Sequence, residues 1–389
     1  MTTLKRASAP APRGFITMAR VGWRMMFHDK LKMAGTVLGV VFAVVLSNQQ
    51  LGVFGGLVYK NVMFAENAGA DLWVIPGSAE TLAPGQPLSD AVLMQARVTP
   101  GVAVADPLLY SGASIQLPGG GTEAVTLIGT RAPAFLGGPW NFVVGDRSAL
   151  ASPDTVLFET SDRDKLGGLN PGSIRELNGH RVVVGGFTWG LVPFGPSFAF
   201  ADYDLAQRLL RFDRDRMSYV LVKVQDGANV ADVQAALQAR VPETKVVTAV
   251  ELRWMIVKYL LTRTQIGVSF GTSTVFGLLI GLIIVALSMF SSVIDNLREF
   301  GTLKAIGATT TDLAKLLFVQ SVTYAVLGSL VGSFLVTRIS GGIRSAQLQM
   351  FVPPQMTLIT WALMIGMCVA ASTLALMRIR KVEPGMVFR

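Results

Sequence analysis

The sequence is poor in the side chains that usually carry catalysis and metal binding. It has one cysteine, Cys368, and two histidines, His28 and His180, among 389 residues. A lone cysteine excludes a disulfide within the chain, and two histidines distant in sequence give little support to a metal site or a Ser/His/Asp triad. The phosphate-binding pattern G-x-x-x-x-G-K-[ST] does not occur, and residues 119–121 fit a turn between strands. We therefore predict no catalytic residue, no metal and no cofactor in this chain.

Charge is also scarce. Charged residues make up 15% of the chain and hydrophobic residues 51%, whereas soluble domains carry about 25% charged residues. Residues 59–263 hold 18 Lys and Arg against 20 Asp and Glu, and the rest of the chain holds 16 against 5. The basic excess therefore flanks apolar runs, which indicates membrane topology rather than binding to nucleic acid.

Four apolar stretches are long enough to cross a bilayer, which requires roughly 20 helical residues. They are residues 33–59, 267–294, 316–337 and 354–377. Residues 60–266 lie between the first and second stretch. The fold class that we predict is an α-helical membrane protein with four transmembrane helices and a domain inserted between helices 1 and 2. The remaining parts are the segments 1–32, 295–315, 338–353 and 378–389.

The orientation follows from the basic residues near the span ends. Those before the first span are Lys5, Arg6, Arg13, Arg20, Arg24, Lys30 and Lys32, and those after the fourth are Arg378, Arg380, Lys381 and Arg389. The positive-inside rule places both termini in the cytoplasm and residues 60–266 outside it. Arg338 and Arg344 oppose this assignment weakly. We expect a multi-pass protein of the bacterial inner (cytoplasmic) membrane.

The inserted region has the pattern of a mixed α/β domain, with two lobes. The predicted strands are residues 71–75, 113–117, 124–129, 155–158, 181–184, 219–224 and 245–248, and the predicted helices are residues 89–97, 202–210 and 230–240. The order strand, helix, strand over residues 219–248 suggests a βαβ unit.

Residues 15–28 have the pattern of an amphipathic helix before the first span. Arg20, Arg24 and His28 recur on one face, and Trp23 and Phe27 are among the apolar residues beside them. This composition suits a helix on the anionic inner leaflet of the lipid membrane. Packing against the transmembrane helices is the alternative.

Residues 295–312, between the second and third spans, have the pattern of a short amphipathic helix. Leu297, Phe300 and Leu303 recur every three residues, and Gly307 suits the position just after a helix. A second helix is expected to start around Thr311. A short helix on the cytoplasmic side can dock into a partner and pass force along both neighbouring spans.

Residues 298–308, REFGTLKAIGA, resemble the RE-x-G-x-L-(R/K)-A-(I/M/L)-G-A signature of FtsX-like ABC transporter permeases, the superfamily that contains MacB and DevC. In that family the segment is the coupling helix that docks into the ATPase subunit. The resemblance therefore implies an ATPase-coupling site made of Leu297, Arg298, Glu299, Phe300, Gly301, Thr302, Leu303, Lys304, Ala305, Ile306 and Gly307.

The resemblance extends over nearly the whole chain. The tail RKVEPGMVFR, with Pro384, resembles the closing element of the family, and the segment 145–158, GDRSALASPDTVLF, resembles the DevC branch. The resemblance implies a homodimer of the permease with two copies of a cytosolic ATPase that binds ATP and Mg. In the family, an HlyD-type membrane-fusion adaptor often joins this complex. The implied function is export of an amphipathic substrate by mechanotransmission.

Two other functions share this topology. A non-transporting FtsX-like transmitter activates cell-wall hydrolases outside the membrane, but its outer insert is smaller than the one predicted here. Lipoprotein release is the second, and the first span lacks the sequence of that branch. A neighbouring gene for an ATPase and an adaptor would favour export, and one for a murein hydrolase would favour signalling.

Polar and small residues inside the spans allow two interpretations each. Asn48, Gln49 and Gln50 lie roughly 24–27 Å along the first span and could line a substrate path or form hydrogen bonds between helices. The pairs Gly277/Gly281 and Gly328/Gly332 could permit close helix approach at a dimer interface, or they could reflect only the high frequency of glycine in membrane spans.

Overall fold

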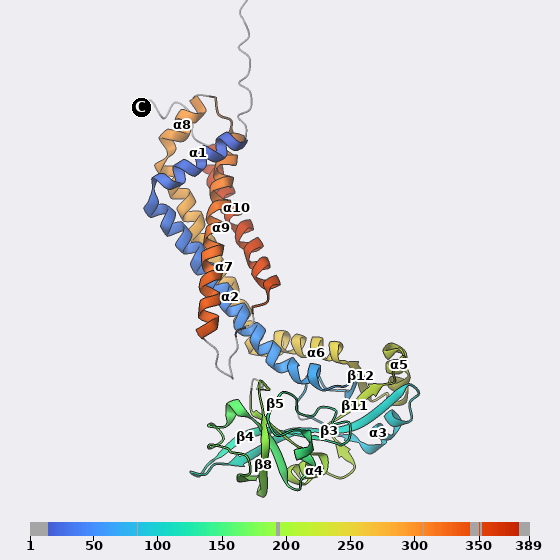
Figure 1. Ribbon diagram of the computed structural model, residues 1–389. Coiled ribbons are helices and arrows are strands. Elements are labelled where there is room, and N and C mark those ends of the chain that lie inside the picture. Colours follow the sequence, from blue (N-terminus) through green and yellow to red (C-terminus); the bar gives the residue numbers. More distant parts are fainter. Residues whose placement is uncertain are drawn as a thin grey trace, which may run out of the picture. The chain divides into compact units, whose positions relative to one another are not determined.

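The computed structural model describes residues 15–83, 85–191, 195–305, 307–342, 350 and 352–380 (Figure 1). The chain divides into two compact units. We call them the helical bundle, which contains the described residues up to Gly55 and from Ser269 onward, and the outer domain, which contains Gly56–Val268. The boundary between Gly55 and Gly56 falls inside one continuous helix, α2.

The helical bundle consists of long apolar helices and two short ones. Its helices are α1 (Phe15–His28), α2 (Lys30–Asn67), α7 (Gln265–Asp295), α8 (Leu297–Ala305), α9 (Thr310–Gly342) and α10 (Pro354–Arg380). Four of them, α2, α7, α9 and α10, are long and apolar enough to cross a membrane. The predicted fold class is confirmed: four apolar helices, with an α/β extracytoplasmic domain between the first and second.

The helices extend beyond the apolar stretches that predicted them. α2 continues past Tyr59 to Asn67. α9 begins at Thr310, before the apolar stretch that starts at residue 316 and next to the helix start predicted around Thr311. Hydropathy marks where a helix meets lipid, whereas backbone hydrogen bonding continues into polar sequence. The helix ends therefore could not be located from hydropathy.

Glycines let two helices approach α2 within the same chain. A Cβ added at Gly281 of α7 would lie 2.4 Å from the Cβ of Ala43, and one at Gly328 of α9 would lie 2.4 Å from Cγ1 of Val40. These distances are too short for any side chain. These two glycines are therefore used for packing inside the chain, which was not predicted from the sequence.

The outer domain is built on a ten-stranded sheet. Its strands are β1 (Leu72–Pro76), β3 (Val102–Gln116), β4 (Thr122–Thr130), β5 (Phe142–Val144), β6 (Thr155–Glu159), β7 (Ile174–Leu177), β8 (His180–Thr188), β9 (Ser197–Asp202), β11 (Tyr219–Val224) and β12 (Thr244–Thr248), and β2 (Leu88–Ser89) pairs with β10 (Arg216–Met217). Its helices are α3 (Asp90–Arg97), α4 (Tyr203–Leu210), α5 (Val230–Arg240) and α6 (Ala249–Thr262).

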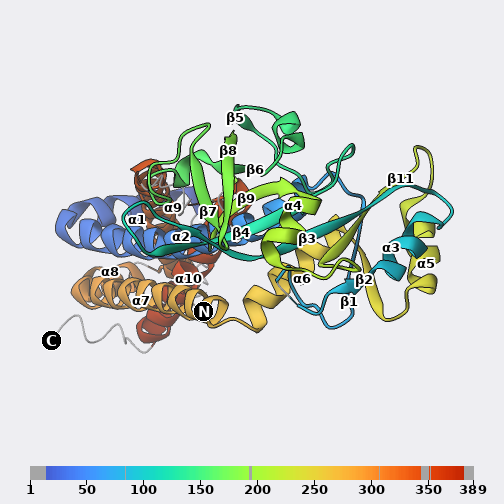
Figure 2. The same ribbon diagram turned by 90° about the horizontal axis from the view of Figure 1, so that it is seen from below.

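The strand order is β12-β1-β11-β3-β4-β9-β6-β8-β5, and β7 pairs with both β3 and β8. β11 and β12 are each antiparallel to β1, which lies between them, so the predicted βαβ unit is a split one. Two lobes were expected in this domain, and one continuous sheet runs through its described residues. α3 and α5 lie beside each other at one end of this sheet (Figure 2).

Each strand and helix predicted for the outer domain has a counterpart in the structure, and several further elements were not predicted. The first half of β3 was missed because Asp106 and Pro107 interrupt the apolar pattern, although Pro107 pairs with Val220 of β11. β9 and α6 were also missed. For α6 a signal existed in Thr248 and Glu251, which form a capping box at its start.

The capping box of α6 gives a pH prediction. The backbone N–H of Thr248 donates to Glu251 and holds the pKa of this carboxyl below its ordinary value of 4.5. A lowered pKa contributes stability that is present above pH 4.5 and lost as the pH falls below it. We expect Glu251→Gln to flatten this acid decline in melting temperature, and Thr248→Ala to cost about 1 kcal/mol at neutral pH. Thermal unfolding of the full chain across this pH range measures both, and an unchanged acid decline in Glu251→Gln would contradict the assignment.

Candidate functional site

α8 forms the segment between the second and third membrane helices. α7 ends at Asp295, and the N–H of Phe300 donates to the carbonyl of Asn296 at the start of α8, 2.9 Å away. α8 ends in a Schellman motif, in which the N–H of Ala308 donates to the carbonyl of Leu303 and that of Gly307 to the carbonyl of Lys304. Gly307 has φ +95°, which confirms that it follows the helix in the left-handed conformation.

α8 has one buried face and one exposed face. Phe300 is 2% exposed, Gly301 is buried and Leu303 is half-buried. Phe300 belongs to an apolar cluster that includes Met26, Val293, Leu313, Leu316 and Leu317. The exposed residues of α8 are Arg298, Glu299, Thr302 and Ala305. The buried face fastens α8 to the bundle, and the exposed face is free for a partner.

The remaining residues of the predicted coupling site differ in burial and position. Lys304 is half-buried and Gly307 is exposed. Leu297 is the first residue of α8, and Ile306 lies outside the described residues. The termini 1–14 and 381–389, with their basic residues and Pro384, also lie outside them, as does Arg344.

α9 begins with a capping interaction that was not predicted from the sequence. The hydroxyl of Thr309 accepts from the N–H of Asp312 at 3.2 Å, and the carboxylate of Asp312 accepts from the N–H of Thr309 at 3.1 Å. Lys315 donates to the same carboxylate at 3.1 Å. The T-x-x-D spacing could have located this cap. It satisfies backbone donors in the first turn of α9, directly after the end of α8.

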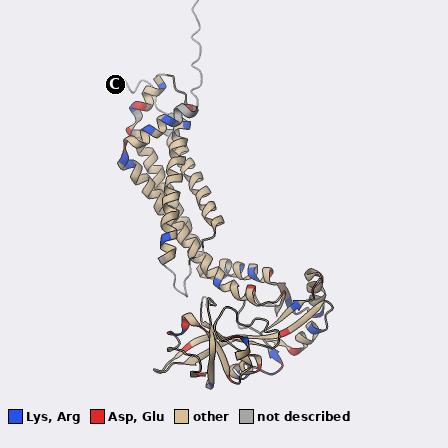
Figure 3. Ribbon diagram, in the orientation of Figure 1, with Lys and Arg blue, Asp and Glu red and all other residues tan. Residues whose placement is uncertain are grey.

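A charge cluster joins α2 to the end of α7, directly before α8. The ammonium of Lys32 donates to Asp295 and lies 3.3 Å from Asp29 Oδ2, and Ser291 donates to Asp295 at 3.1 Å. Lys32 stands at a helix start and Asp295 at a helix end, where each charge is opposed by the helix dipole. Their pairing offsets both penalties. Figure 3 shows most of the charges of the bundle gathered at this end, on α1, α8 and the start of α2.

The ion pair gives a second prediction. Lys32→Glu places like charges beside Asp29 and Asp295, so we expect a lower melting temperature of the full chain in detergent and faster hydrogen exchange at the end of α7. Both charges are about half exposed, so the effect is small and decreases with salt. Combining Lys32→Glu with Asp295→Lys should restore part of the loss, because the pair with residue 295 forms again while residue 32 still lies beside Asp29. Equal loss in the single and double variants would show that no pairing exists.

α1 packs on α9 and also exposes an aromatic, cationic face. The amide of Gln320 donates to the carbonyl of Gly22 at 3.1 Å, and Met26 is buried. Trp23 and Phe27 stack with centroids 5.4 Å apart, and 49% and 40% of their surfaces are exposed. The two alternatives for this helix are therefore compatible, because one face packs on the bundle while the other is free.

The polar residues of the first span differ in burial. Asn48 is 1% exposed, and its Oδ1 accepts from the hydroxyl of Thr360 on α10 at 3.2 Å. Gln49 and Gln50 are half-buried. Asn48 thus makes the hydrogen bond between helices that was the alternative to a substrate path.

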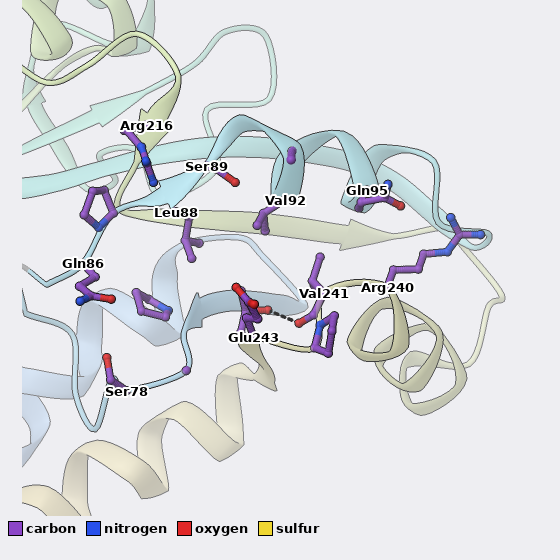
Figure 4. Close-up of a pocket in the computed structure, with 16 residues that line it drawn as sticks. Ser78, Gln86, Leu88, Ser89, Val92, Gln95, Arg216, Arg240, Val241 and Glu243 are labelled. Atoms are coloured by element: carbon purple, nitrogen blue, oxygen red, sulfur yellow. Dashed lines mark hydrogen bonds between the residues drawn. The ribbon is translucent and has the colours of Figure 1, made fainter.

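A cleft of about 670 Å³ lies in the outer domain. Leu88 and Val92 face Val241 and Glu243 across it, and Arg216 and Arg240 lie toward its two ends (Figure 4). The lining combines apolar side chains with the charged groups of Arg216, Arg240 and Glu243, a mixture that can contact an amphipathic molecule. None of the coupling-site or substrate-path residues predicted from the sequence lines this cleft.

Comparison with known proteins places the parts described above in one family. Residues 33–240 match the MacB-like periplasmic core domain, and residues 271–384 match the C-terminal region of FtsX-like permeases. Uncharacterised ABC transporter permeases of Mycobacterium bovis and Mycobacterium tuberculosis are 25% identical over 339 residues, which cover 82% of this chain and 84% of theirs.

Two solved structures are also similar to this chain. The extracellular domain of the ABC-type transporter YknZ from Gram-positive bacteria has 15% identity and a TM-score of 0.35, covering 46% of this chain and 99% of that one. The periplasmic region of MacB from Actinobacillus actinomycetemcomitans has 13% identity and a TM-score of 0.40, covering 50% and 98%.

The core-domain match alone extends over more than half of the 389 residues and the permease match over most of the remainder. The chain therefore belongs to the FtsX-like ABC transporter permeases with a MacB-like periplasmic core domain, as a non-catalytic membrane subunit.

Proposed function

We propose that this permease couples ATP hydrolysis by a separate cytosolic ATPase to the expulsion of an amphipathic substrate. The observation that carries the proposal is α8: its exposed residues Arg298, Glu299, Thr302 and Ala305 form a docking face, while Phe300 fastens the helix to the bundle. Force applied to the exposed face reaches the bundle because the buried face cannot move independently of its neighbours.

Three contacts provide a route from α8 toward the substrate side. Phe300 packs among residues of α1, α7 and α9, and Asp295 pairs with Lys32 at the start of α2. α2 continues without a break to Asn67, and its residue Phe64 is buried in the outer domain. In this proposal α2 and α7 carry the movement of α8 to the outer domain, and the cleft between α3 and β12 is a candidate contact for the substrate.

The complex that we propose contains two copies each of the permease and the ATPase, and the ATPase binds ATP and Mg. An HlyD-type adaptor completes it, as in the DevC branch. Both termini and α8 lie in the cytoplasm of a bacterium, and the exposed face of α1 rests on the anionic inner leaflet. Support for this orientation comes from the basic residues Arg20, Arg24, Lys30 and Lys32 at that end of the bundle. Gln49 and Gln50 remain candidates for the substrate path.

Affinity purification of the full chain in mild detergent, followed by mass spectrometry of bound proteins and lipids, tests the proposal. We expect an ABC ATPase, an adaptor and an amphipathic molecule. An ATPase recovered with a cell-wall hydrolase and without an adaptor or an amphipathic ligand would contradict export and support the signal-transmitting alternative.

A further inference from the structure

α6 has two apolar faces, whereas a helix at a protein surface in water normally has one. Leu252 and Ile256 are buried at 0% and 1% exposure, on the side that contacts β1 and β12. On the other side, Val250, Trp254 and Leu261 have 63%, 60% and 48% of their surfaces exposed. These three residues recur at helical spacing on one face, which no described residue of the outer domain covers.

The exposed face also carries positive charge. Lys258 lies between Trp254 and Leu261 along this face, and no described carboxylate lies within salt-bridge distance of it. The guanidinium of Arg253 lies 5.7 Å from the ring centroid of Trp254 and pairs with Glu66 at 3.3 Å. Trp with Lys and large apolar residues on one helix face is the composition of helices at the boundary between membrane and water.

The chain itself holds α6 near the membrane. α6 ends at Thr262 and α7, a helix apolar enough to span a membrane, begins at Gln265. The three residue steps between these ends extend at most about 11 Å. This length is comparable with the headgroup layer of each leaflet, about 5–8 Å deep. The last turn of α6 is therefore separated by no more than this length from a helix that crosses the membrane.

We propose that the face of α6 formed by Val250, Trp254, Lys258 and Leu261 contacts the headgroup region of the outer leaflet. The indole of Trp254 lies at the level of the headgroups, the apolar side chains enter the acyl boundary, and the ammonium of Lys258 faces lipid phosphates. The contact requires only a multi-pass chain with an extracytoplasmic domain, so it does not depend on coupling to an ATPase.

Site-directed spin labelling of the full chain in phospholipid vesicles tests the contact. In a Cys368→Ser background, nitroxides are placed at Val250→Cys, at Leu261→Cys and, as the control, at Ala235→Cys on the exposed side of α5. Collision with oxygen, which concentrates in lipid, is compared with collision with a water-soluble nickel chelate. We expect the oxygen-to-nickel ratio at positions 250 and 261 to be severalfold that at position 235.

Two results would overturn the proposal. A ratio equal to that at position 235 would mean that the face lies in water. Low collision with both reagents would mean that protein, such as a second copy of this chain, covers it. A further variant, Trp254→Ser, should lower the ratio at position 261 toward that of the control without changing the melting temperature in detergent, because the indole touches lipid rather than the core.

Discussion

A chain that carries Arg298→Glu and Glu299→Lys is expected to lose its ATPase subunit on purification and to lose stimulated ATP hydrolysis in the reconstituted complex. Both side chains are exposed on α8, so reversing them changes the docking face without disturbing Phe300 beneath it. Reversing charges at an interface costs several kcal/mol when like charges become juxtaposed, so we expect affinity to fall by about a hundredfold or more.

The matched control is Arg338→Glu, an exposed charge reversal near the other end of α9. It should leave binding of the ATPase unchanged. The melting temperature of the α8 variant in detergent should also equal that of the wild type, which separates lost docking from unfolding. If the α8 variant retains both binding and stimulated hydrolysis, the exposed face of α8 is not the coupling surface.

Phe64→Ala is expected to destabilise the outer domain by about 3–5 kcal/mol, the cost of deleting a fully buried phenylalanine. Phe64, on α2, is 2% exposed and lies 5.6 Å from Tyr110 and Phe198 and 5.9 Å from Trp73 between ring centroids. Edge and tilted contacts of this kind add to the loss of buried area. The change therefore releases the end of α2 from the sheet.

Hydrogen exchange of the full chain in detergent measures this loss as faster exchange in β1, β3 and β9. The matched control is Phe276→Ala, because Phe276 on α7 is 64% exposed in the bundle and no cavity forms when its ring is removed. Phe64→Leu should recover part of the protection. Unchanged exchange in Phe64→Ala would mean that the aromatic cluster does not hold α2 on the sheet.

Features that depend on neighbouring residues in the sequence were predictable. The apolar runs located α2, α7, α9 and α10, and the three-residue spacing of Leu297, Phe300 and Leu303 located α8 with Gly307 after it. The turn signals and alternating patterns located the strands on both sides of α5. Hydrophobic periodicity and capping act within a few residues, so one sequence contains them.

Features that depend on distant partners were not predictable. Lys32 and Asp295 are 263 residues apart, and Asn48 and Thr360 are 312 apart. The sequence therefore allowed two roles for Asn48, a substrate path or a hydrogen bond between helices, and it did not indicate a partner for Lys32. The same holds for the glycines that pack against α2.

The sequence by itself determined that the chain spans a membrane four times, carries an α/β insert and places an amphipathic helix with a family signature between spans two and three. Hydropathy and helical period determine these features locally. Only the tertiary structure decided which face of α8 is free, which residue ties α2 to α7, and that α6 keeps a second apolar face exposed. Each of these depends on what packs against a side chain, and packing is a property of segments that meet only in the folded chain.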